Sequence, residues 1–99
     1  MNEENKAKFK AAVEDGKAKA NAMMQSEFAK CKTILDMQEV YRGCVDGIQS
    51  MAPIIASGFL NSGGAVEDLQ PTVQTWIDES VGSLNAIYDD ATQRFATVH

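Results

Sequence analysis

The sequence predicts an all-α protein, a small antiparallel helical bundle built on a helical hairpin, in a single domain over residues 1–99. Apolar side chains recur three and four residues apart along most of the chain, which is the spacing of one α-helical face. No segment alternates apolar with polar residues, and no Asn-Gly turn joins two β-branched segments, so strands are not expected. One strong break, at residues 61–64, separates two amphipathic segments.

The clearest helix covers residues 66–98. Its polar face carries acidic pairs that recur every eleven residues. Pro71 fits a helix only in the first turn, so the regular helix is predicted to begin near Gln70, after a turn at 65–69. The apolar face consists of Val66, Leu69, Val73, Ile77, Val81, Leu84, Ile87, Tyr88, Ala91, Phe95 and Val98.

A second helix is predicted over residues 36–60. The apolar stripe keeps its phase on both sides of Pro53, so we expect a kink there and not an end. The helix should stop at the loop 61–64, because Asn and Gly tolerate the left-handed backbone that ends helices. A short loop between two amphipathic helices predicts an antiparallel hairpin of 36–60 and 70–98. The stripe consists of Ile34, Met37, Tyr41, Cys44, Val45, Ile48, Met51, Ala52, Ile55 and Phe59.

Residues 3–35 form a segment rich in Ala, Lys and Glu, with high helix propensity. The segment repeats every eleven residues, or about 3.67 per turn, which is close to an undistorted helix. Its apolar face is thin at the start, so residues 1–8 are expected to fray. This helix either packs on the hairpin or extends away from it as an arm.

The junction between the first two helices is open to two interpretations. If the segments before and after Thr33 are drawn as one continuous α-helix, the apolar face shifts by about 100° around its axis near this residue. Thr33 and Asp36 resemble a capping box, which would begin a new helix. No Gly or Pro interrupts residues 31–36. We therefore favour a continuous or gently kinked helix through this junction.

The charge is acidic and uneven. Nine basic residues face fourteen acidic ones, for a net charge of −5. Residues 1–33 hold seven Lys and five acids, whereas residues 34–99 hold two Arg and nine acids. This balance argues against direct nucleic-acid binding, which requires a basic surface. The two parts of opposite charge favour attraction within the chain or between copies.

The sequence carries no catalytic constellation, so we expect neither an enzyme nor a cofactor or metal site. The only histidine, His99, ends the chain. Cys31 and Cys44 lack a metal-ligand spacing and are expected to be free thiols in the cytoplasm. The acidic pairs recur roughly 16 Å apart along a helix, too far to share one cation. The most apolar run, residues 51–60, is too short to span a bilayer, and no signal segment begins the chain.

The expected function is a non-enzymatic protein–protein interaction module, such as an adaptor, inhibitor or assembly factor, that also forms homodimers or higher assemblies. Its partner is another protein, a second copy, or both. Trp76 lies at the edge of its stripe, where core packing is favoured over an interface anchor. The candidate partner-binding residues are Trp76, Asp78, Glu79, Tyr88, Asp89 and Asp90.

A second function follows from a resemblance. In residues 29–50 a Lys-rich start leads to Met37-Gln38 and then to Tyr41-Arg42. This segment, roughly a fifth of the chain, resembles the helical region of phasins, which coat polyhydroxyalkanoate granules. The resemblance implies an amphipathic protein that binds a hydrophobic granule or lipid surface.

Overall fold

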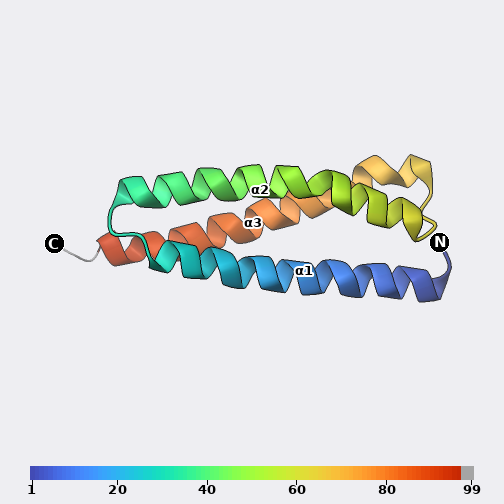
Figure 1. Cartoon of the computed structure of the whole chain (residues 1–99), viewed down its shortest axis with the longest axis horizontal. Helices are drawn as coiled ribbons and strands as arrows, with labels where there is room; N and C mark the ends of the chain where they lie inside the picture. Colours follow the sequence, from blue (N-terminus) through green and yellow to red (C-terminus); the bar gives the residue numbers. More distant parts are fainter. Residues whose placement is uncertain (97–99) are drawn as a thin grey trace.

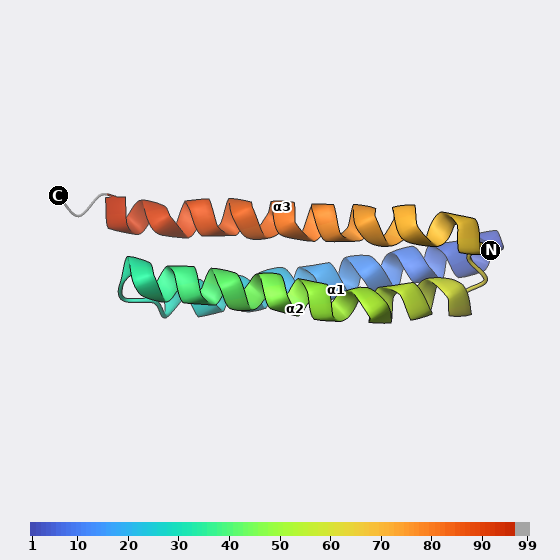
Figure 2. The same cartoon turned by 90° about the horizontal axis from the view of Figure 1, so that it is seen from above.

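The computed structural model describes residues 1–96, which form helices and connecting turns only. Three long helices, α1 (Glu3–Ala29), α2 (Ile34–Asn61) and α3 (Leu69–Ala96), run antiparallel to their neighbours in sequence, and a 3-10 turn, η1 (Val66–Asp68), precedes α3. α1 and α2 lie side by side, and α3 crosses behind both (Figures 1 and 2). This arrangement confirms the all-α bundle and the hairpin.

The bundle is elongated, and its core is correspondingly thin. It measures 55 × 19 × 15 Å with a radius of gyration of 16.0 Å, whereas a compact domain of this length has about 13 Å. No core position is far from solvent in a rod of this width. Among residues 1–95, six apolar side chains are buried: Met24, Phe28, Cys31, Met37, Phe59 and Leu84.

The predicted continuous helix through residues 31–36 is wrong. α1 ends at Ala29 and α2 begins at Ile34. The Thr33 hydroxyl accepts the Asp36 backbone N–H at 3.0 Å. The Asp36 carboxylate accepts the backbone N–H groups of Lys32 at 3.0 Å and Thr33 at 3.2 Å. This capping box satisfies the free donors at the start of α2, so the turn needs neither Gly nor Pro.

The capping box makes the stability of the fold depend on pH in the acidic range. The backbone N–H of Lys32, followed by that of Thr33, lowers the pKa of Asp36 below its ordinary value of 3.8. A lowered pKa in the folded state adds stability that is present above pH 3.8 and is lost as the pH falls through the folded value. Asp36→Asn should therefore flatten the dependence of the melting temperature on pH between about 6 and 3. The melting temperatures of the wild type and Asp36→Asn are measured by circular dichroism. The same pH dependence in both would contradict the capping role.

The hairpin turn forms where the sequence predicts it. Gly63 adopts a positive φ of 91°, and the Gly64 backbone N–H donates to the Phe59 carbonyl at 2.9 Å. A Cβ at Gly64 would overlap the Phe59 ring, so this close approach requires glycine. Pro71 is the third residue of α3, within the first turn, as expected.

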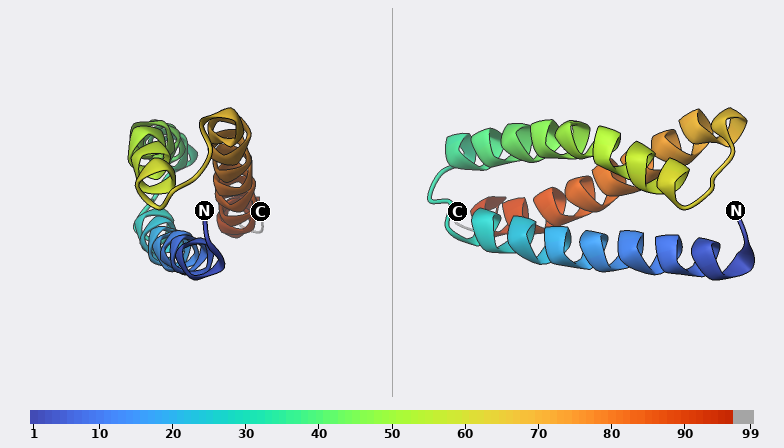
Figure 3. Two further views of the ribbon diagram at one scale, coloured as in Figure 1. Left: turned by 90° about the vertical axis from the view of Figure 1, so that its right-hand side faces the viewer. Right: turned by 45° about the vertical axis from the view of Figure 1, so that its right-hand side comes forward.

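α2 continues through Pro53 to Asn61. Its later part bends toward α1 (Figure 3), in agreement with the expected kink. The sequence predicts Val66 in the apolar stripe, but this residue is 73% exposed. It lies in the 3-10 turn η1, which has fewer residues per turn than an α-helix and precedes α3.

α1 packs on the hairpin and is not an extended arm. Phe9 of α1 meets Phe59 of α2 edge to face, with ring centroids 5.7 Å apart. Lys17 of α1 pairs with Glu79 of α3 at 2.7 Å. α1 begins regularly at Glu3, where the side chain of Asn2 accepts the Asn5 backbone N–H at 2.8 Å. Fraying of residues 1–8 concerns motion and stays a prediction.

Candidate functional site

One end of the bundle, at the α1–α2 turn, has a closed core. Phe28, Met37 and Leu84 are fully buried there, one from each helix. Tyr88 packs edge to face on both Phe28 and Tyr41, with centroids 5.8 and 5.0 Å apart. These contacts tie the three helices together at this end.

Arg94 of α3 caps the end of α1. Its guanidinium donates to the carbonyls of Phe28 at 2.9 Å, Ala29 at 3.1 Å and Cys31 at 2.7 Å. The last turn of α1 contains no basic residue of its own. The cation on α3 therefore supplies charged donors to carbonyls at and just beyond the C-terminal end of α1, where the helix dipole favours positive charge.

Arg94→Ala should destabilise the fold by about 2 kcal/mol, because three carbonyls lose a charged donor. Arg94→Lys should recover part of this loss, since an ammonium group cannot reproduce the planar fork of the guanidinium. Arg42→Ala removes the other arginine, which is exposed on α2, and serves as the control. The measurement is urea unfolding followed by circular dichroism. Equal midpoints for the two alanine variants would contradict the capping role.

Both cysteines are free thiols and contribute to this closed end. Burial raises the pKa of the Cys31 thiol, and the nearby Asp36 carboxylate raises it further. Burial also raises the pKa of Cys44, with a smaller contribution from Glu27. A raised pKa lowers the thiolate fraction, so both cysteines behave as small apolar core residues.

The other end of the bundle, near the N-terminus, contains an open groove between the three helices. Its volume is about 640 Å³, within the usual range for ligand pockets. Its aromatic walls are Phe9 of α1, Phe59 of α2 and Trp76 of α3, and Val13 and Ile55 add aliphatic surface. We call this site the aromatic groove.

Charged side chains surround the aromatic groove. At its inner end Lys17 pairs with Glu79 at 2.7 Å and reaches Glu14 at 4.0 Å. Lys10 and Asp68 lie on the rim nearer the N-terminus. An apolar centre within a charged rim is the usual anatomy of a protein interface.

The structure does not gather the six predicted partner-binding residues into one surface. Trp76 and Glu79 line the aromatic groove. Tyr88 is half-buried against the closed core. The others are exposed on α3 and line no part of the groove: Asp78, which accepts a hydrogen bond from Gln74 at 2.9 Å, Asp89 and Asp90.

Phe9 and Phe59 were not recognised as candidate site residues. Each belonged to an apolar stripe, and a stripe does not reveal whether its members meet in a closed core or in an open groove. Two aromatic residues near the outer ends of paired antiparallel helices were the available signal. Their partnership depends on the turn at residues 30–33, which the sequence analysis did not favour.

Among residues 1–96, no group of three or more His, Cys, Asp or Glu side chains is placed to hold a metal ion. No helix in that range is long and apolar enough to cross a bilayer. His99 and Val98, named in the sequence analysis, lie outside the described residues. No protein-family model, curated protein or solved structure matches the chain.

Proposed function

We propose that the protein is a non-enzymatic helical interaction module of the adaptor, inhibitor or assembly-factor kind, acting in the cytoplasm and self-associating. The aromatic groove is its binding site for the apolar side chains of another protein. One observation carries the proposal: the core closes at one end of the bundle, whereas aromatic rings from all three helices line an open groove at the other. Trp76 then acts as an interface anchor.

The chemistry of the groove favours a helical protein segment as its ligand. Tryptophan and other aromatic side chains are enriched among the residues that dominate binding energy at interfaces. Helices recognise grooves of this kind by inserting apolar residues from one face. Lys10 and Asp68 on the rim would orient such a helix through its flanking charges.

The test selects helical peptides from a displayed library against the wild-type protein. Bound peptides should shift the fluorescence of Trp76, the only tryptophan. Thr75→Arg places a bulky charge on an exposed residue that lines the groove, and it should weaken binding at least tenfold. Gln74→Arg makes the same change at the neighbouring exposed position outside the groove and should leave binding unchanged. Peptides that bind both variants equally would contradict the groove as the site.

A second candidate function is supported by a different observation. Residues 47–66 contain no charged side chain, although 23% of the whole chain is charged. Within them Met51, Ile54, Leu60 and Val66 are 40–73% exposed. This surface, with the resemblance of residues 29–50, favours a coat protein of the phasin type. Such a protein should be retained on hydrophobic beads and on lipid vesicles, and failure to bind either would rule it out.

A further inference from the structure

The net charge of the protein lies entirely on one layer of the bundle. Residues 1–65 contain eight basic and eight acidic side chains, for a net charge of zero. Residues 66–99 contain six acids and one arginine, which gives the full −5. α3 lies behind α1 and α2 in Figure 1, and the turned views of Figures 2 and 3 show it on one side of the layer that these two helices form. The layer formed by α1 and α2 is therefore neutral, and its face turned away from α3 is covered by no described element.

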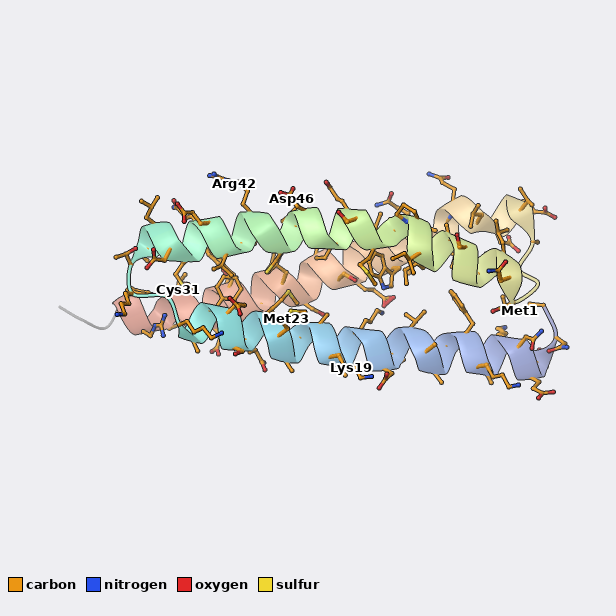
Figure 4. The ribbon with its side chains drawn as sticks, in the orientation of Figure 1. Met1, Lys19, Met23, Cys31, Arg42 and Asp46 are labelled. Atoms are coloured by element: carbon orange, nitrogen blue, oxygen red, sulfur yellow. The ribbon has the colours of Figure 1, made fainter. Side chains whose placement is uncertain are left out.

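Several large apolar side chains are exposed on that face. Ile54 is 60% exposed on α2 and Met23 is 63% exposed on α1. Ile54 lies about 140° around α2 from Tyr41, which hydrogen-bonds Asn85 of α3. Met23 lies about 120° around α1 from Lys17, which reaches α3. Figure 4 views the protein from this side and labels Met23. We call this surface the neutral face; it includes Met23, Gly43, Gly47, Met51 and Ile54.

We propose that the neutral face is the self-association surface, on which a second copy of the chain packs about a two-fold axis. The proposal deepens the self-association in the proposed function and rests on it. Electrostatics select this face, because the two −5 layers then lie on the outside of the dimer, as far apart as the bundle allows. Contact through α3 would instead bring the two acidic layers together.

The side of the bundle that carries the neutral face is large enough for a stable dimer. Figure 1 views the bundle from this side, down its shortest axis, and the outline of the whole bundle measures 55 by 19 Å, or roughly 1,000 Å². A specific interface buries about 800 Å² on each partner. Three exposed lysines are matched by acids three or four residues earlier in the chain and add little net charge: Lys8 with Glu4 and Lys19 with Asp15 in α1, and Lys30, just after α1, with Glu27.

The shape of α2 suits an antiparallel copy. Ile54 and Gly47 are seven residues apart and lie within about 20° of one another around the helix. A two-fold axis between them places Ile54 of each copy over Gly47 of the other. The position of a Cβ at Gly47 has no neighbour within 4 Å, so the bare backbone leaves room for the incoming side chain.

The test is sedimentation equilibrium of the wild type, Ile54→Lys and Val66→Lys. The two variants exchange an exposed aliphatic residue for the same cation, but Val66 lies in η1, outside the neutral face. The wild type and Val66→Lys should be dimers. The dissociation constant of the Ile54→Lys dimer should be at least tenfold higher than that of the wild type. Circular dichroism should show equal helix content in all three. If Ile54→Lys loses helix, Gly47→Leu replaces it, because that position has open space in the monomer.

The outcomes separate this inference from the proposed function. A wild type that is monomeric at every concentration overturns self-association and the neutral face together, and leaves peptide binding to the aromatic groove as a separate result. A dimer that persists in Ile54→Lys but dissociates in Thr75→Arg overturns the neutral face alone. A monomer that binds vesicles through Ile54 overturns the inference in favour of the coat function.

Discussion

Leu84→Asp is expected to unfold the protein. Leu84 is 0% exposed and packs in a cluster of buried residues shared by the three helices. Aspartate there would either bury an unpaired charge or take up a proton, and a loss of about 4 kcal/mol follows in either case. A thin core in so short a chain leaves a small margin of stability, so this loss removes most of it. The measurement is the helical circular dichroism signal at 25 °C and its loss in urea.

Leu35→Asp provides the matched control. Leu35 is 64% exposed in the first turn of α2, where an added carboxylate meets the positive end of the helix dipole. This variant should keep the wild-type urea midpoint or exceed it slightly. If Leu84→Asp also stays folded and loses only self-association, the α3 stripe is an interface and the bundle core is misassigned.

Phe28→Ala is expected to cost about 3–5 kcal/mol, the usual loss for a buried phenylalanine. Phe28 is 0% exposed, and its ring packs edge to face on Tyr88. Alanine would remove that aromatic contact and leave a cavity between the three helices. The Phe28 carbonyl would still accept the Arg94 hydrogen bond, so the loss reports side-chain packing. The urea midpoint and slope give the free energy of unfolding.

Phe9→Ala is the comparison that tests the difference between the two ends. Phe9 also packs edge to face on another ring, Phe59, but it is half-buried and lines the aromatic groove. Its removal should therefore cost only about 1–2 kcal/mol, because part of its surface is already in water in the folded protein. Equal losses for Phe9→Ala and Phe28→Ala would show that the groove end is as tightly packed as the turn end.

The hairpin was predictable because short segments of the sequence determine it. The apolar stripes around Ile48 and Leu84 keep the period of an α-helix. The turn at Gly63-Gly64 has a backbone conformation that glycine adopts most easily. Pro71 indicates the first turn of α3. Each signal lies within a few residues of the structure it determines. No long-range contact had to be known in advance.

The remaining features depend on contacts between distant residues. The break before α2 was not favoured, because the absence of Gly and Pro at this junction was given more weight than the capping box. The Arg94 cap on α1 could not be foreseen, because Arg94 lies over sixty residues away in the sequence. The candidate site was only partly predicted for the same reason. Trp76 was identified from its type and position, but Phe9 and Phe59 join it only after α1 folds back on the hairpin.

The most direct test of the account is amide hydrogen exchange along α1, resolved by residue in the full-length protein. The closed core predicts the slowest exchange in the last third of α1, around Met24 and Phe28. The open groove predicts progressively faster exchange toward Glu3, including the expected fraying of residues 1–8. Uniform protection along α1 would contradict a bundle that is closed at one end and open at the other. Uniformly fast exchange would contradict the docking of α1 altogether.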